Sequence, residues 1–439
     1  MKNFVSAILV LLLVFPLCVS AKVQVESWST ENNVSVLYAQ VPELEMVDMY
    51  LAFDAGSTRD GKKHGLANLV SALILQGASD LNVDEFNEAI GLTGGNLSSG
   101  SSSDMAYIKM RSLTEQANLE AVMRLLKLAL SSPRFDDSDV NRLVARTLIG
   151  LDFKKQSPAA VAQDELYAEL FAAHPYGFPH EGTAESVKSI TRDDVSKFFN
   201  EFYVAKNLNI SIVGAVNLRQ AKAMAEEISS ILVSGERADK VFSPPSKKTQ
   251  GILVKRNFPS IQSHIRVGAR SVERGHPDYF PLLVANHALG GNSLVSVLFR
   301  SIREERGLAY SAYSYFSPKL TGGSLVAAVQ TDRENQEEAL SVLDSSLEKL
   351  RLEGFSGKDI DSAKDNLIGG FPLRVDTNAE ILNYLAMLGF YKLPTDYLET
   401  FAGNVDRVTR AEVSRVFNRY LSPEKLVTVI VGPNQDGDE

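Results

Sequence analysis

The residue types best suited to metal binding or nucleophilic chemistry are scarce in this sequence. It has one cysteine, Cys18, and six histidines, at positions 64, 174, 180, 264, 276 and 287. His64 has no second histidine at helical spacing, so we expect it on the surface or in a loop. His174 and His180 flank the segment HPYGFPH, where a turn is expected and a zinc site is the alternative. The motif G-x-S-x-G and a complete phosphate loop, G-x-x-x-x-G-K followed by Ser or Thr, are absent, so an independent hydrolase is the least favoured interpretation.

Arg303 and Tyr310 stand seven residues apart in the stretch RSIREERGLAYSAYSYF. The pattern predicts a helix that ends at Gly307, followed by a strand. The turn between them could place a guanidinium and a phenol side by side, and both can donate to a substrate carbonyl. An arginine that complements the helix dipole and an ordinary strand tyrosine would explain the spacing equally well, and more simply.

The first 21 residues are typical of a secretory signal peptide. Lys2 precedes an apolar stretch at residues 4–19, and Ala21 closes a small-residue triplet suited to cleavage. A membrane anchor is the alternative, but the stretch is short for a span and contains Pro16. Cleavage would remove the only cysteine and with it any disulfide framework. We therefore expect a periplasmic or secreted protein with no stable membrane anchor.

Two segments of the sequence repeat one another in gapless register. Residues 190–217 (ITRDDVSKFFNEFYVAKNLNISIVGAVN) match residues 408–435 (VTRAEVSRVFNRYLSPEKLVTVIVGPNQ). A weaker match joins LAFDAGS at 51–57 to IRVGARS at 265–271. The chain therefore contains a duplication that spans most of each half.

Each copy begins with a helix signal and ends with a strand signal. Thr191 is followed three residues later by Asp194, and Thr409 by Glu412, which predicts two capping boxes. A β-branched run closed by glycine then predicts a buried strand. The same helix and strand should therefore complete both halves.

These signals predict an α+β or α/β sandwich that is built twice along the chain. After the signal peptide (1–21), we expect an N-terminal domain at 22–235, a linker at 236–250 that contains two adjacent prolines, and a C-terminal domain at 251–439. A length of 439 residues also favours more than one domain. The net charge of −9 argues against nucleic acid as a partner.

The first half resembles the pitrilysin/insulinase-type zinc peptidases, which include the mitochondrial processing peptidase and the core proteins of the respiratory bc1 complex. The resemblance rests on three stretches, DAGSTRDGKKHGLANLVSALILQGA, GLTGGNLSSGSSSDMAYIKM and HPYGFPHEGTAESVKSIT, and on the duplication. It covers nearly all of the chain after the signal peptide. It implies an α+β fold of two homologous domains, each a mixed, mostly antiparallel sheet flanked by helices. It also implies that such a two-domain chain is one half of a clamshell and faces a second two-domain half around a chamber.

Catalytic members of that family carry the inverted zinc motif H-x-x-E-H after a Gly-Leu-Ala lead. The lead is intact at residues 65–67, but the motif positions hold Asn68, Ser71 and Ala72. The apolar residues at positions 66, 69, 70, 73 and 74 keep helical spacing and predict one apolar stripe on this helix. Alanine has no ligand atom, asparagine is a poor zinc ligand, and serine cannot act as a carboxylate base. The resemblance therefore implies no catalytic residue in this motif and no metal in this chain.

The resemblance also assigns roles elsewhere in the chain. The family's third ligand falls at Gly150 or Ile149, and the nearest acid, Asp152, would face away from the site. In the second half, Arg303 and Tyr310 match the family's pair that binds the substrate backbone. The zinc is then expected in a partner subunit.

The favoured hypothesis is a non-catalytic subunit of an exported heterodimeric metallopeptidase. Its partners would be a homologous zinc-bearing subunit and a peptide substrate. The alternative is a structural subunit similar to the respiratory core proteins, with no role in proteolysis.

Overall fold

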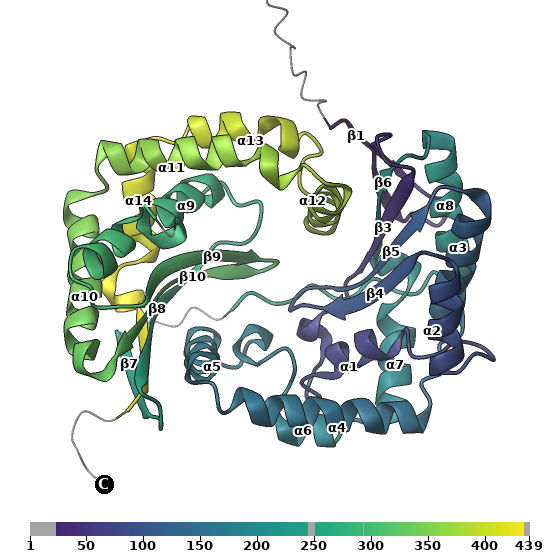
Figure 1. The fold of residues 1–439 in the computed structure, drawn as a ribbon, viewed down its shortest axis with the longest axis horizontal. Helices are drawn as coiled ribbons and strands as arrows, with labels where there is room; N and C mark the ends of the chain where they lie inside the picture. Colours follow the sequence, from purple (N-terminus) through teal and green to yellow (C-terminus); the bar gives the residue numbers. More distant parts are fainter. Residues whose placement is uncertain (1–22, 245–250, 293, 434–439) are drawn as a thin grey trace, which may run out of the picture.

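The computed structural model describes residues 23–244, 251–292 and 294–433, which form two β-sheets surrounded by helices (Figure 1). The expected signal peptide and residues 245–250 of the expected linker lie outside these ranges. Within the described residues, no helix combines the length and apolar character needed to cross a bilayer.

The first sheet has six strands in the order β1-β2-β6-β3-β5-β4. Its strands are β1 (Val25–Ser29), β2 (Ser35–Gln40), β3 (Met46–Phe53), β4 (Asn96–Ser101), β5 (Ala106–Leu113) and β6 (Leu208–Gly214). The second sheet has five, in the order β7-β11-β8-β10-β9. Its strands are β7 (Ile252–Asn257), β8 (Gln262–Ser271), β9 (Ser311–Lys319), β10 (Gly322–Asp332) and β11 (Val427–Gly432).

The two sheets share one topology. Without the edge strand β1, the first order is β2-β6-β3-β5-β4, which corresponds strand for strand to the second. The pairs β2/β6 and β7/β11 are parallel, and the other pairs are antiparallel. The predicted α+β fold with two mixed, mostly antiparallel sheets is confirmed.

Helices pack on the outer faces of the two sheets, and other helices lie between the sheets. The first half holds α1 (Leu66–Leu73), α2 (Val83–Leu92), α3 (Gln116–Ser131), α4 (Asp137–Lys154), α5 (Pro158–Phe171), α6 (Ala184–Lys188), α7 (Arg192–Phe202) and α8 (Leu218–Ile231). The second half holds α9 (Tyr279–Asn286), α10 (Gln336–Glu353), α11 (Gly357–Gly370), α12 (Asn378–Tyr391), α13 (Tyr397–Asp406) and α14 (Arg410–Tyr420). Short turns are the 3-10 segments η1 (Ser57–Arg59), η2 (Pro175–Gly177), η3 (Ala205–Asn207), η6 (Arg333–Asn335), η7 (Pro372–Arg374) and η8 (Pro423–Lys425), and the π-helical segments η4 (His287–Gly291) and η5 (Phe299–Glu304).

Both predicted capping boxes form, at the start of α7 and α14. The backbone N–H of Asp194 donates to Thr191 Oγ1 (3.3 Å), and the N–H of Thr191 donates to Asp194 Oδ2 (2.9 Å). Thr409 and Glu412 repeat this arrangement at 3.2 and 2.8 Å. Such a cap stabilises a helix by about 1 kcal/mol, so local sequence fixes where these two helices begin.

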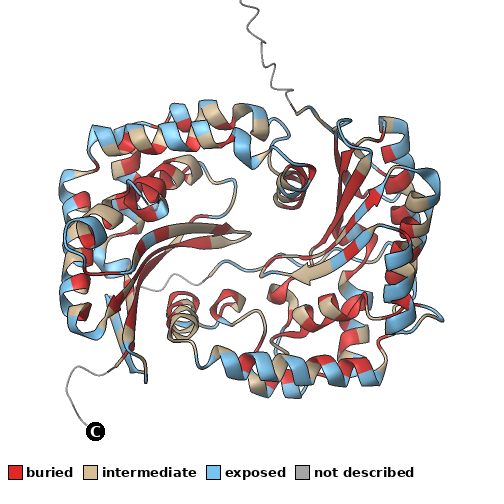
Figure 2. Cartoon of the chain, in the orientation of Figure 1, coloured by how far each residue is buried: buried red, intermediate tan, exposed pale blue. Residues whose placement is uncertain are grey.

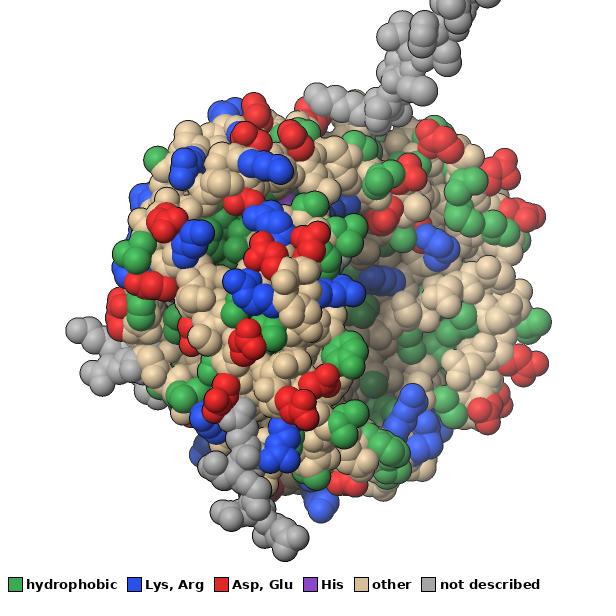
Figure 3. Space-filling model, turned by 60° about the vertical axis from the view of Figure 1, so that its left-hand side comes forward, with side chains coloured by type: hydrophobic (Ala, Val, Ile, Leu, Met, Phe, Trp, Pro, Cys, Tyr) green, Lys and Arg blue, Asp and Glu red, His purple; other side chains and the backbone are tan. Residues whose placement is uncertain are grey.

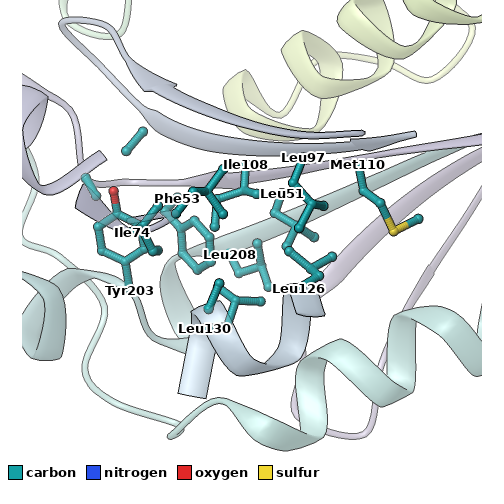
Figure 4. Packing of buried hydrophobic residues seen from close by; sticks show 14 of the residues in the cluster. Leu51, Phe53, Ile74, Leu97, Ile108, Met110, Leu126, Leu130, Tyr203 and Leu208 are labelled. Atoms are coloured by element: carbon teal, nitrogen blue, oxygen red, sulfur yellow. The ribbon is translucent and has the colours of Figure 1, made fainter. Parts of the chain in front are cut away.

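The core of the first half lies between its sheet and the helices on its outer face. Figure 4 shows Leu51 and Phe53 of β3 beside Ile108 of β5, with Leu126 and Leu130 of α3 packed against them. All five side chains are at most 2% exposed. Burial of each such side chain contributes about 1.5–3 kcal/mol, so this layer holds the sheet to its helices.

The two halves exchange a helix across their interface. Helix α12 of the second half packs against β2, β3 and β6 of the first sheet, and α5 of the first half packs against β8 and β11 of the second. Both helices carry buried side chains and lie between the two sheets (Figure 2). The approach of α5 is close, because a Cβ at Gly268 would lie 3.1 Å from a Leu166 methyl group. The exchange was not predicted from the sequence.

A buried carboxylate joins the hairpins of the two halves. Asp104, only 2% exposed, accepts hydrogen bonds from the Tyr176 hydroxyl (2.5 Å), the Tyr391 hydroxyl (2.8 Å) and the Leu320 N–H (3.0 Å). Burial, and then the charge of Asp104, raise the pKa of both phenols, so both remain protonated donors. The ammonium of Lys319 lies 4.4 Å from the centre of the Tyr176 ring. The first half therefore contacts both the β9–β10 hairpin and the end of α12 at this point.

The described part of the expected linker contains no helix or strand but is held against the first half. Arg59 Nη1 donates to the Asp239 carbonyl (2.6 Å), and the N–H of Ala238 donates to Asn207 Oδ1 (2.8 Å). These bonds fix the path of the segment from its start to at least residue 239.

Candidate functional site

The helix α1 that carries the altered zinc motif begins at a strained glycine. Gly65 has φ +96°, and a Cβ there would lie 2.5 Å from the Glu181 carbonyl oxygen, so the position requires glycine. Asp60, 5% exposed, accepts hydrogen bonds from the N–H groups of Gly65 and Ala67, both at 2.7 Å. Burial raises the pKa of Asp60 to about 7 although both bonds oppose this shift.

Sequence reasoning missed Asp60. An acid five residues before the Gly-Leu-Ala lead was a visible signal, because carboxylates commonly accept the free N–H groups of a helix start.

The three motif positions form one side of α1. Asn68 and Ala72 are half-exposed, whereas Ser71 is 1% exposed. The Ser71 hydroxyl donates to the Asn68 carbonyl of its own helix (2.9 Å), and Ser99 Oγ donates to the Ser71 carbonyl (2.6 Å). The predicted apolar stripe of α1 is buried on its other side. These side chains do not fit a zinc ion, since one has no ligand atom and another bonds within the helix.

The positions proposed for a third ligand lie on α4. Ile149 is 59% exposed, and a Cβ at Gly150 would have no neighbour within 4 Å. Gly150 is exposed as well, but it follows the buried Leu143 by two helical turns and so lies nearer to the inward side of α4 than residue 149 does. Asp152, as expected, faces outward, with its side chain 75% exposed.

Four of the six histidines, at positions 64, 174, 180 and 276, lie in loops or turns, whereas His264 is in β8 and His287 is in η4. The His64 ring stacks on Phe178 with ring centres 3.9 Å apart, and burial lowers its pKa. His174 is fully buried: its Nδ1 accepts from the Tyr176 N–H (3.1 Å), and its Nε2 lies 2.8 Å from the Phe242 carbonyl oxygen. The predicted turn role of His174 is thus observed. Across the described residues, no three His, Cys, Asp or Glu side chains gather closely enough to hold a metal ion.

Arg303 and Tyr310 lie at the two ends of one exposed turn in the second half. Arg303 is in η5, and Tyr310 comes directly before β9. The Gly307 N–H donates to the Arg303 carbonyl (3.0 Å), and the Tyr310 N–H donates to the Gln330 carbonyl (3.0 Å). The backbone at both residues is therefore fixed.

The side chains of this pair remain accessible. Tyr310 is 62% exposed, and Arg303 is exposed with its guanidinium 5.3 Å from the centre of the Phe299 ring. Within the described part of the chain, neither side chain has a hydrogen bond or an ion pair. The structure therefore brings both predicted residues to one turn, and it brings the three motif positions together on α1 in the other half.

The fold and the altered motif define a peptidase-like protein with two similar halves. A model of the family described as Insulinase (Peptidase family M16) matches residues 35–184, and one described as Peptidase M16 inactive domain matches residues 189–367. The chain belongs to the M16 peptidase family, as an inactive, peptidase-like member.

Several relatives span nearly the same length. A crystal structure of a peptidase M16 inactive domain from Pseudomonas fluorescens is 31% identical with a TM-score of 0.90, over 94% of this chain and 98% of that one. A non-peptidase homolog, YmxG, from Helicobacter pylori is 25% identical over 91% of this chain and 92% of its own. The uncharacterized zinc protease YmxG of Bacillus subtilis is 23% identical over 93% and 98%.

Proposed function

We propose that this chain is the non-catalytic subunit of an exported, heterodimeric zinc peptidase, in which Arg303 and Tyr310 bind the peptide substrate. The zinc and the general base would come from a homologous partner that retains H-x-x-E-H, where the metal would activate water. This chain would hold the peptide backbone and donate hydrogen bonds to the carbonyl under attack. Export is inferred from the N-terminal sequence.

The observation that carries the proposal is the exposed donor pair on a fixed turn. Among the described residues neither side chain has a hydrogen-bond or ion-pair partner, so both donors are free to bind a substrate. Arg303 also lies in a π-helical segment, a geometry frequent at functional sites. The surface between the two halves is hollowed, with Lys and Arg side chains along its rim (Figure 3).

The test is peptide cleavage by the reconstituted complex. The purified chain is mixed with a homologous chain that retains H-x-x-E-H, and kcat and KM are measured for a fluorogenic peptide. Arg303→Ala and Tyr310→Phe are each expected to lower kcat/KM by about tenfold to a thousandfold, because each removes a donor to the substrate.

Arg306→Ala is the matched control. Arg306 lies on the same exposed turn but pairs with Glu305 at 3.0 Å, so its loss should leave cleavage unchanged. If Arg303→Ala and Tyr310→Phe behave like this control while the complex still forms, the pair has no role in proteolysis. The scaffold alternative would then be favoured.

A further inference from the structure

Arg266 lies on the face of the second sheet that is turned toward the first half. Its cross-strand neighbours are Val429 on β11 and Ala328 on β10. Helix α5 covers part of this face, because Leu166 of that helix contacts Gly268 two residues along β8. Figure 1 shows α5, and with it this face, between the two sheets. Arg266 therefore belongs to the inner surface of the molecule.

The guanidinium of Arg266 has no acidic partner. The residue is 9% exposed, and its Nη1 donates a single hydrogen bond, to the Tyr313 hydroxyl at 2.9 Å. Its Nε is buried with no hydrogen-bond partner, and among the described residues no carboxylate lies within 4.0 Å. By contrast Arg256, on β7, which β11 separates from β8 in the sheet, forms an ion pair with Glu165 of α5.

A buried cation without a counter-charge is costly to keep, so an external group that supplies the missing acceptor would be bound favourably. His264, two residues away and 9% exposed, adds no charge at neutral pH, because burial and then the nearby Arg266 lower its pKa. The open donors of Arg266 suit a carboxylate, which a guanidinium can bind through two nitrogens. Tyr313, 36% exposed, lies beside these donors at the edge of the inner face.

We propose that Arg266 binds a carboxylate of the peptide held between the halves, so that this subunit selects acidic peptides. This inference rests on the proposed function, since it assumes that a peptide enters the same space. The carboxylate would belong either to an Asp or Glu side chain or to the C-terminus of the peptide.

Binding of three labelled peptides to the purified full chain, measured by fluorescence anisotropy, tests the proposal. The first peptide carries a central Glu and an amidated C-terminus, the second has Gln in its place, and the third has Gln and a free C-terminal carboxylate. One of the two charged peptides is expected to bind about tenfold to a hundredfold more tightly than the neutral one. The charged peptide that binds more tightly than the neutral one identifies the source of the carboxylate.

Arg266→Gln is expected to abolish the higher affinity for the charged peptide without lowering the affinity for the neutral peptide. Arg256→Gln removes a guanidinium that Glu165 already neutralises, so this variant should keep the higher affinity for the charged peptide. If Arg266→Gln does not fold, Arg266→Lys is used, which keeps the charge but not the two-nitrogen geometry and should lose most of the gain. Equal binding of all three peptides, no binding of any, or a full gain in the Arg266 variants overturns the proposal.

The outcome is separable from that for Arg303. Arg303→Ala is expected to weaken all three peptides equally, because backbone binding does not distinguish them. If Arg303→Ala leaves cleavage by the complex unchanged but the charged peptide still binds more tightly through Arg266, only the proposed function is contradicted. If cleavage depends on Arg303 and neither charged peptide binds more tightly than the neutral one, only the proposed carboxylate site is contradicted.

Discussion

Replacing Asp104 by asparagine should loosen the two halves from one another. In the wild-type chain, Oδ1 accepts from the Tyr176 hydroxyl, while Oδ2 accepts from the Tyr391 hydroxyl and the Leu320 N–H. Asparagine keeps one acceptor oxygen and places an NH2 group at the other position, so at least one of the three donors loses its acceptor whichever way the amide is turned. With about 1–3 kcal/mol for the buried hydrogen bond that is lost and about 1 kcal/mol for the lost charge assistance of the remaining bonds, the free energy of unfolding should fall by about 3 kcal/mol.

Urea unfolding with two probes measures both the loss and its location. Trp28, in β1, is the only tryptophan, so its fluorescence reports the first half, whereas far-UV circular dichroism reports both. The two transitions should coincide in the wild-type chain and separate in Asp104→Asn. Asp48→Asn is the control, because Asp48 is 3% exposed and pairs with Arg111 inside the first half, so its loss should shift both transitions together. Coincident transitions at the wild-type midpoint in Asp104→Asn would refute this account of the interface.

Two further predictions concern α1. Installing the zinc motif as Asn68→His, Ser71→Glu and Ala72→His should give weak zinc binding, and adding Gly150→Glu should tighten it at least tenfold, as measured with a competing chromogenic chelator. Equal affinities with and without the fourth change would show that residue 150 is not the third ligand position. The second prediction is a pH dependence. Because burial raises the pKa of Asp60 to about 7 from about 3.9 when unfolded, the folded state binds the proton more tightly, and stability should fall as pH rises between these values. The free energy of unfolding of Asp60→Asn, relative to that of the wild type, should therefore rise by up to about 4 kcal/mol between pH 4 and pH 7.5. A difference between the two proteins that stays constant across this range would contradict the prediction.

Sequence patterns predicted those parts of the fold that depend on neighbouring residues. Capping boxes, a β-branched run closed by glycine and an apolar stripe at helical spacing each act within one element, so they are visible along the chain. The capping boxes at α7 and α14, the strands β6 and β11 and the buried side of α1 follow from such patterns. The repeat then predicted that the same topology would be built twice.

Contacts between distant parts of the chain were not predicted. Asp104 reaches partners 72, 216 and 287 residues away, and no periodicity marks any of them. Nothing in the sequences of α5 and α12 indicated that each helix is covered by the sheet of the opposite half. Arg266 was likewise missed, because whether a charged residue lacks a partner depends on residues far along the sequence.

Packing explains the altered motif but not the exposed donor pair. Asn68 and Ala72 lie on the half-exposed side of α1, away from its buried stripe, so histidines are not needed there to keep the helix in place. Ser71 is buried, and a glutamate at that position would place a carboxylate in the core with no cation beside it, which costs several kcal/mol. Arg303 and Tyr310 contribute little to the core, because both are exposed on a turn already fixed by backbone hydrogen bonds. Both side chains are therefore available for the role proposed above, toward a peptide or a partner.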